Sequence, residues 1–155
     1  MKLSSALTNL WSLLLRLAVG GFWLFFASQR WLDRAWVKPL LETAAGGNYL
    51  PFYGSLLRQA AQSWETITLA VTIAETAVGV MILLGFFPRA AAAAGAFIAL
   101  NLWLAFSFCS CPWNTTDAPQ VFWFYFSAFL LNLAVLREKN HPSLIRGVKR
   151  SWKTS

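Results

Sequence analysis

The chain has 155 residues, of which 57% are hydrophobic and only 12% are charged. That balance excludes an ordinary water-soluble globular domain and indicates an integral membrane protein. The formal net charge of +7 does not indicate nucleic-acid binding, because the basic residues concentrate at the C-terminus without an aromatic stacking platform or a nucleic-acid motif. We therefore expect the lipid bilayer, and no nucleic acid, among its partners.

Four apolar stretches can cross a bilayer as helices, since one span takes about 20 residues. In chain order they cover residues 10–27, 66–87, 90–108 and 121–136. Pro88 separates the second stretch from the third by a short turn, and Pro112 and Pro119 lie between the third and the fourth, where helices are expected to break. The predicted fold is all-α: an integral membrane four-helix bundle with a long connector between its first and second helices.

The first stretch is too long for a signal peptide, contains Arg16 and ends in FFASQRW without a convincing cleavage site, so we expect a retained helix. The connector that follows covers residues 30–64. Its segment GGNYLPFYG is typical of turns, and SLLRQAAQS predicts a short helix at the membrane interface.

The distribution of Lys and Arg predicts the orientation. One side of the predicted bundle carries more of them: Lys2, Arg89, Arg137, Lys139, Arg146, Lys149, Arg150 and Lys153. The other side carries Arg30, Arg34, Lys38 and Arg58. By the positive-inside rule, both termini lie in the cytoplasm of a cell (inner) membrane. Residues 1–136 then form the multi-pass membrane domain, and residues 137–155 form a basic cytoplasmic tail.

Two ionisable residues fall inside the predicted spans, where a charge is costly and often functional. Arg16 lies near the level of Asn132, and Glu75 lies near the level of Asn101. These residues could join helices by hydrogen bonds, with Arg16 and Glu75 reaching towards each other. Alternatively Arg16 reaches the inner headgroups and Glu75 stays protonated, able to donate a hydrogen bond to a carbonyl such as that of a quinone.

Glycines follow both charged residues at one helical turn. Gly20 and Gly21 come after Arg16, and Gly79 comes after Glu75. Small residues at such positions allow neighbouring helices to approach closely, so we expect helix contacts there.

Three segments carry a family resemblance: LLRLAVGGFWLFFASQRW, GNYLPFYG and AETAVGVMILLGFFPRAAA. Over residues 10–136 the chain resembles the DoxX/DoxD family, and most closely its DoxD-type small membrane subunit of thiosulfate:quinone oxidoreductase. The positions that match the family pattern are Arg16, Gly20, Glu75, Gly79 and Arg89. The outer end of the first helix departs from it, because many members carry a glycine and a lysine where this chain has Ala27, Gln29 and Arg30. The resemblance implies a four-helix membrane protein linked to sulfur-compound or redox metabolism at the quinone pool.

The only two cysteines, Cys109 and Cys111, stand two positions apart. In the predicted orientation they lie on the outer side, where disulfides persist. They are either a packed pair of free thiols or a disulfide closed over one residue, which would be of the easily reduced, catalytic kind. We expect no metal site, since two thiolates are too few ligands and the only histidine, His141, falls on the opposite side.

The function expected from these features is that of an enzyme subunit, the membrane subunit of a sulfur-compound (thiosulfate):quinone oxidoreductase. The expected catalytic residues are Cys109, Cys111 and Glu75. The expected substrate-binding residues are Arg30, Arg34 and Arg16. Glu75 and Asn101 are expected to bind the quinone cofactor. No haem, metal or nucleotide is expected, so the cysteines or a second subunit must carry the electrons. The partner is therefore a second subunit or another copy of the chain.

Two other functions remain open at this stage. One is a non-catalytic membrane scaffold or assembly factor, which would dock a partner through its aromatic and alanine-rich faces. The other is a small-molecule transporter, in which the Arg/Asn and Glu/Asn layers would line a path.

Overall fold

The computed structural model describes residues 2–113 and 120–137. These residues form six helices and no named strand; an isolated β-bridge joins Asn48 to Cys109. The helices are α1 (Lys2–Leu32), α2 (Val37–Gly47), α3 (Pro51–Gln62), α4 (Trp64–Leu84), α5 (Pro88–Ser107) and α6 (Gln120–Arg137). The all-helical prediction is thus confirmed for the part of the chain that is described.

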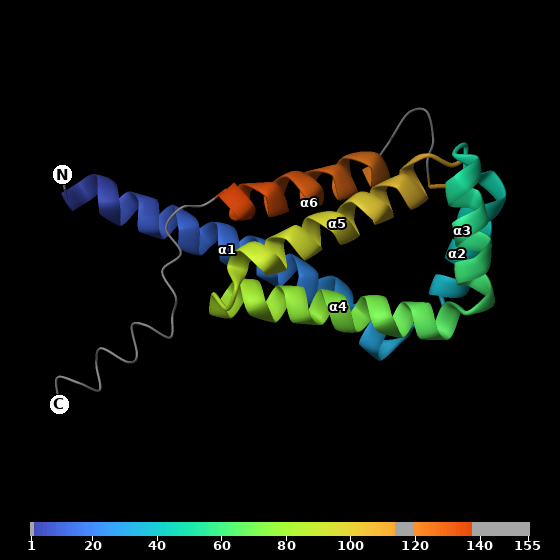
Figure 1. The fold of residues 1–155 in the computed structure, drawn as a ribbon, viewed down its shortest axis with the longest axis horizontal. Helices are drawn as coiled ribbons and strands as arrows, with labels where there is room; N and C mark the ends of the chain where they lie inside the picture. Colours follow the sequence, from blue (N-terminus) through green and yellow to red (C-terminus); the bar gives the residue numbers. More distant parts are fainter. Residues whose placement is uncertain (1, 114–119, 138–155) are drawn as a thin grey trace.

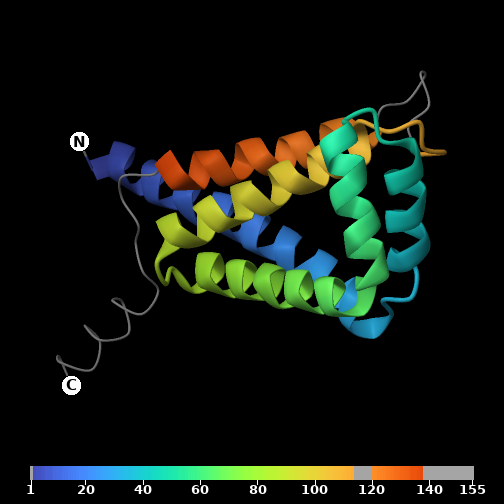
Figure 2. The same cartoon turned by 45° about the vertical axis from the view of Figure 1, so that its right-hand side comes forward.

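The long helices α1, α4, α5 and α6 run lengthwise beside one another, while α2 and α3 lie across one end (Figures 1 and 2). Helix α1 begins, and helix α6 ends, at the opposite end. Three helices are long and apolar enough to cross a membrane, namely the segments Leu10–Leu32, Trp64–Leu84 and Pro88–Ser107. The segment Val121–Arg137 is a shorter apolar helix.

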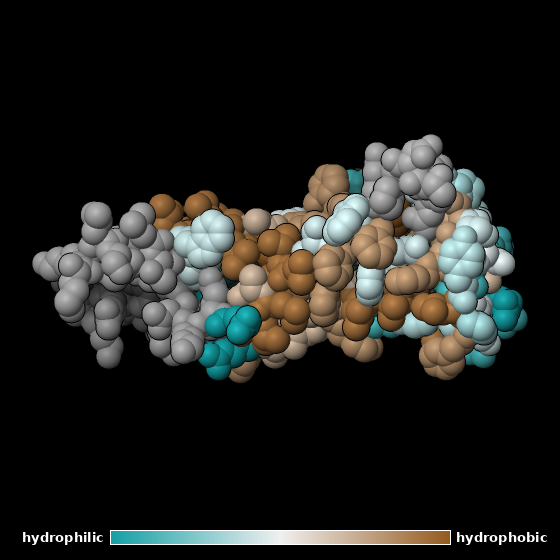
Figure 3. Space-filling view, turned by 90° about the horizontal axis from the view of Figure 1, so that it is seen from above, coloured by the Kyte–Doolittle hydropathy of each residue, from teal (hydrophilic) through white to brown (hydrophobic). Residues whose placement is uncertain are grey.

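The surface of the long helices is largely apolar. Figure 3 shows hydrophobic side chains along the length of the molecule, with hydrophilic ones gathered mainly near its ends. On α4, Ile73 and Val80 are exposed while Val78 and Ile82 are buried. A helix that is apolar on both its inner and its outer face is expected where hydrocarbon, rather than water, surrounds it.

Helix α1 continues beyond its predicted end at Ala27. No helix breaker occurs before Leu32, and the turn that follows is fixed by Asp33, whose Oδ1 accepts a hydrogen bond of 2.9 Å from the backbone N–H of Ala35. With 31 residues the helix is about 46 Å long at 1.5 Å per residue. Arg30 therefore belongs to the last turn of α1 and not to the connector.

The connector contains two helices where we predicted one. Helix α3 begins at Pro51 and includes most of the predicted short helix. Helix α2 was not predicted; only the turn segment GGNYLPFYG, in which α2 ends, was identified there. Pro39 lies in the first turn of α2, where its missing N–H has no intrahelical partner to lose.

Glycines set the closest approach of α1 and α4. A Cβ atom added to Gly20 would lie 3.0 Å from the carbonyl oxygen of Gly79, and one added to Gly79 would lie 3.0 Å from that of Gly20. The predicted contact is therefore confirmed for these two residues. It is wrong for Gly21, around which a Cβ would meet nothing within 4 Å.

Candidate functional site

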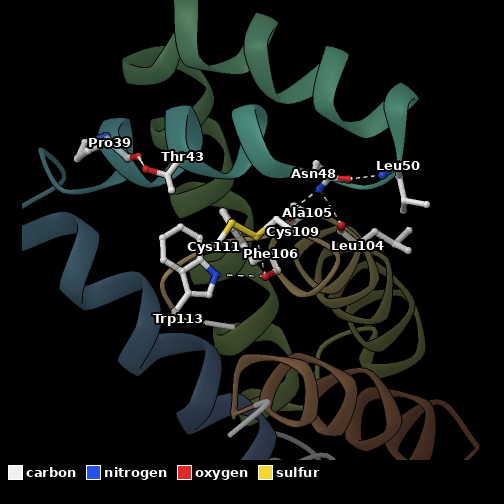
Figure 4. The surroundings of a disulfide bond; sticks show 10 residues. All are labelled: Pro39, Thr43, Asn48, Leu50, Leu104, Ala105, Phe106, Cys109, Cys111 and Trp113. Carbon is white, nitrogen blue, oxygen red and sulfur yellow. Dashed lines mark hydrogen bonds between the residues drawn. A yellow bond between two sulfur atoms is a disulfide. The ribbon is translucent and has the colours of Figure 1, made fainter. Parts of the chain in front are cut away.

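The two cysteines form a disulfide, with their Cα atoms 5.2 Å apart. It lies in the loop that leaves α5, at the end of the molecule covered by α2 and α3 (Figure 4). Cys109 is 2% exposed and Cys111 is 4% exposed. The sulfur pair is therefore covered by protein instead of being open at the surface.

Hydrogen bonds join the disulfide loop to the turn between α2 and α3. The N–H of Ser110 donates to the carbonyl oxygen of Gly47 at 2.9 Å, and the N–H of Tyr49 donates to that of Phe108 at 2.7 Å. The side-chain amide of Asn48 donates at 2.9 Å to the carbonyl oxygen of Ala105 (Figure 4). Two segments that sequence analysis treated separately thus form one unit.

An apolar cluster surrounds the disulfide. Its buried members besides the cysteines are Val37, Leu41, Ala44, Ala45, Leu57, Ala105 and Phe106. Trp113 packs against this cluster, and its indole N–H donates to the carbonyl oxygen of Phe106 at 3.2 Å (Figure 4). Most of the cover therefore comes from α2 and the end of α5.

Glu75 forms an ion pair with Arg30, a partner that neither of the two alternatives left open by the sequence had named. Because Gly20 and Gly79 face each other on antiparallel helices, Glu75 is offset from Arg16 by about eight residues, or 12 Å, and from Arg30 by about six, or 9 Å. The side chain of Glu75 is 1% exposed and that of Arg30 is 10% exposed. Glu75 Oε1 and Arg30 Nε have no hydrogen-bond partner among the described residues.

Asn101 does not join Glu75 through its hydrogen bonds. It accepts a hydrogen bond from the hydroxyl of Tyr53 at 2.7 Å, and its amide donates to the carbonyl oxygen of Phe97 at 2.7 Å. Burial raises the pKa of Tyr53 above its usual value, so this hydroxyl remains a donor. Asn101 thus connects α5 to α3.

The remaining predicted residues lie in different places. Arg16 is buried in α1, one turn after the buried Ser12. Asn132 accepts a 3.2 Å hydrogen bond from the indole of Trp23. Arg34 is exposed and lines a shallow hollow of about 400 Å³ that Glu65 also lines. The structure therefore does not gather Arg16, Arg30 and Arg34 into a single basic site.

A cavity of about 80 Å³ lies next to the ion pair. Its polar lining comes from Arg30 of α1, Thr68 of α4 and Tyr125 of α6, while the indole N–H of Trp36 already donates to the carbonyl oxygen of Asp33 at 2.9 Å. The apolar lining is Trp36, Val37, Leu40, Leu41, Ile67, Val71, Leu102 and Phe106. The cavity thus combines an apolar wall with polar groups contributed by three long helices.

The hydroxyl of Thr68 is buried without a hydrogen-bond partner among the described residues. The hydroxyls of Thr72 and Thr76 on the same helix instead donate to the carbonyls four residues earlier, each at 2.7 Å. A buried hydroxyl left unsatisfied is costly, so Thr68 is suited to bind a ligand in the cavity.

Thr68 and Tyr125 were not expected from the sequence to belong to the site. The signal for Thr68 was its spacing, since Thr68, Thr72 and Glu75 recur at i, i+4 and i+7 on one helix face. The signal for Tyr125 was a hydroxyl inside the apolar run FWFYF. Neither signal places the residue beside Arg30, because that depends on how α1, α4 and α6 pack.

Among the described residues, no group of three or more His, Cys, Asp or Glu side chains is placed to hold a metal ion. Comparison of the chain with protein-family models, with curated proteins and with solved structures gave no match. Membership of the DoxX/DoxD family thus remains a prediction from the sequence.

Proposed function

We propose that this chain is the membrane subunit of a DoxX/DoxD-type sulfur-compound:quinone oxidoreductase, which passes electrons from a small sulfur anion such as thiosulfate to membrane quinone. The observation that carries the proposal is a buried two-electron group, the Cys109–Cys111 disulfide, beside a cavity with hydrogen-bonding side chains. Val37, Leu41 and Phe106 belong to the cluster around the disulfide and also line the cavity. This shared wall supports a connection between the two.

In this proposal α6 is a fourth membrane span beside the three long apolar helices, giving a four-helix membrane bundle. Both termini lie in the cytoplasm of the inner membrane, following the excess of Lys and Arg at that end. The end with α2, α3 and the disulfide then faces the outside, a compartment in which disulfides persist.

The cavity is proposed to hold the quinone head group. Glu75 offsets the charge of Arg30, so the polar groups around the cavity favour a neutral acceptor such as a carbonyl over an anion that would be buried uncompensated. Trp36, Phe106 and Tyr125 provide flat walls for a ring. Arg30 is thereby proposed as a quinone ligand instead of an anion ligand, together with Thr68.

The size of the cavity favours a head group over a whole lipophilic molecule. Its volume of about 80 Å³ is small compared with the several hundred Å³ of typical ligand pockets. Two of its lining residues, Trp36 and Ile67, are 43% and 42% exposed. In this proposal the tail of the quinone leaves the cavity between them.

Each half of the redox cycle transfers two electrons. On the quinone side, the reduced cysteine pair loses two protons and two electrons to become the disulfide, and quinone takes up both to become quinol. On the other side, a sulfur anion attacks one disulfide sulfur and releases the second cysteine as a thiolate. A second sulfur anion then attacks the sulfur atom through which the first anion is bonded to the cysteine. This step joins the two anions by a sulfur–sulfur bond and releases the cysteine as the remaining thiolate.

The exposed basic residues of the outer end, Arg34, Lys38 and Arg58, are proposed to attract the anion, although nearby acidic residues weaken that field. A second subunit or a further copy of this chain is the proposed partner. It would complete the binding site for the sulfur anion.

The test is thiosulfate-dependent quinone reduction by the protein in membranes. The parent chain is expected to show activity, and the Cys109→Ser/Cys111→Ser double variant, at equal levels of folded protein, is expected to show none. Unchanged activity in the double variant would remove the cysteines from the mechanism. No activity in the parent, even with its partner present, would favour the scaffold function instead.

A further inference from the structure

The hairpin of α2 and α3 packs over the disulfide, and its helix α2 also lines the cavity. From α2, Val37 and Leu41 line the cavity and belong to the cluster around the disulfide. Leu40 also lines the cavity, and Leu57 of α3 packs in the disulfide cluster. One structural element therefore packs against both sites.

The end of α2 is fastened to the disulfide loop at a single short segment. Ser110, the residue enclosed by the disulfide, donates its N–H to the carbonyl oxygen of Gly47, the last residue of α2. The approach is close, since a Cβ added to Gly47 would lie 3.0 Å from Ser110 Oγ and 3.1 Å from its carbonyl oxygen. The position of the Ser110 N–H depends on the backbone between the cysteines, which the disulfide restrains.

We propose that the α2–α3 hairpin is a lid whose closure depends on the redox state of the Cys109–Cys111 pair. With the disulfide formed, Ser110 and Phe108 are held in the geometry that pairs with Gly47 and Tyr49, and the lid is closed. A dithiol reduces the disulfide by donating two electrons and two protons, and itself becomes a disulfide. The freed loop then holds the hairpin less firmly, and the lid opens more often.

The coupling between the lid and the disulfide is reciprocal. Both cysteines are almost fully buried, and residues of the hairpin form much of their cover, so movement of the hairpin would open a path for an external thiol or sulfur anion. By linkage, any change that favours the open lid must also favour reduction of the disulfide at equilibrium. This inference does not depend on the identity of the ligand in the cavity.

The experiment is amide hydrogen exchange, followed by mass spectrometry, on the full-length protein in lipid nanodiscs with the disulfide formed and after reduction by dithiothreitol. Reduction is expected to speed exchange at residues 44–50 and 108–111 by about 2- to 10-fold, the range that corresponds to one net hydrogen bond. In peptides from the middle of α4 and α5, the exchange rate should change by less than about twofold, so these peptides serve as the internal reference. Neither quinone nor thiosulfate is present, so the result is separate from the redox function proposed above.

A pair of adjacent glycines provides matched variants that leave the sulfurs in place. Gly47→Ala should speed exchange in the same residues with the disulfide intact, because its Cβ meets Ser110. Gly46→Ala should not, because a Cβ there meets nothing within 4 Å.

Equal exchange in the oxidised and reduced parent protein would overturn the proposal, whether or not the glycine variants fold. A uniform increase throughout α4 and α5 would overturn it too, since that would indicate general loosening of the bundle instead of movement of one lid.

Discussion

At the scale of single residues, the largely buried ion pair between Arg30 and Glu75 dominates the polar interior near the cavity. A buried pair contributes little net stability compared with apolar residues, but removing one partner leaves an uncompensated charge. The pair therefore has a large effect on folding when it is broken, whatever its part in ligand binding.

Glu75→Gln is expected to lower the free energy of unfolding by up to about 3–5 kcal/mol, because Arg30, whose side chain is 10% exposed, then lacks its counter-charge. The double variant Arg30→Met/Glu75→Leu is expected to recover most of that loss. Thermal unfolding in one detergent measures both. A single variant as stable as the parent would mean that Arg30 finds another partner or reaches water.

A second residue-scale prediction concerns the unsatisfied hydroxyl of Thr68. Thr68→Val should weaken binding of a short-tailed quinone analogue by about 2- to 10-fold, the value of one net hydrogen bond. Thr72→Val removes a hydroxyl one turn away that does not line the cavity, and it should change the affinity by less than about twofold. Equal effects of the two variants in a nanodisc binding titration would argue against Thr68 as a ligand.

Residue types were easier to predict than their partners. The sequence identified Glu75 as a costly intramembrane acid, and the structure buries it completely. Its partner depended on the register of α1 against α4, which Gly20 and Gly79 set and which a span boundary at Ala27 obscured. The state of the cysteines likewise needed backbone geometry, since either free thiols or a disulfide fits a spacing of two.

At the scale of helices, the extent of the apolar stretches predicted the ends of α4, α5 and α6 to within about two or three residues. The hairpin could not be predicted in the same way. Helix α2 has mixed polarity and a proline in its first turn, and its stability comes from packing on α3 and on the disulfide loop rather than from its own sequence pattern.

The glycine contact between α1 and α4 leads to a prediction at this scale. Gly79→Ala should destabilise the protein by about 1–3 kcal/mol, since the added methyl group meets Leu24 and the backbone of Gly20. In Gly21→Ala the added methyl group meets nothing within 4 Å. This variant should leave the stability of the protein unchanged or raise it by up to about 1 kcal/mol, because Ala has the higher helix propensity. Unfolding midpoints of the two variants in the same detergent provide the comparison, and a reversed order would contradict the observed packing.

At the scale of the whole molecule, the proposed orientation puts the two chemical sites near the outer surface and the basic tail in the cytoplasm. A fluorescent protein that matures only in the cytoplasm should be bright when it is fused to the C-terminus. An alkaline phosphatase fused at the same point should be inactive, because that enzyme needs an oxidising compartment. The opposite pattern would place the disulfide in the reducing cytoplasm and remove the basis for its proposed chemistry.

The most direct test of the redox role is a single-turnover titration of the purified protein in nanodiscs. The Cys109–Cys111 pair is first reduced, the reductant is removed, and a quinone analogue is added without oxygen. The proposal predicts that two protein thiols disappear for each quinol formed, and that the Cys109→Ser/Cys111→Ser variant forms none. Thiols that persist in the presence of excess quinone would contradict the proposed transfer of electrons from this cysteine pair to the membrane.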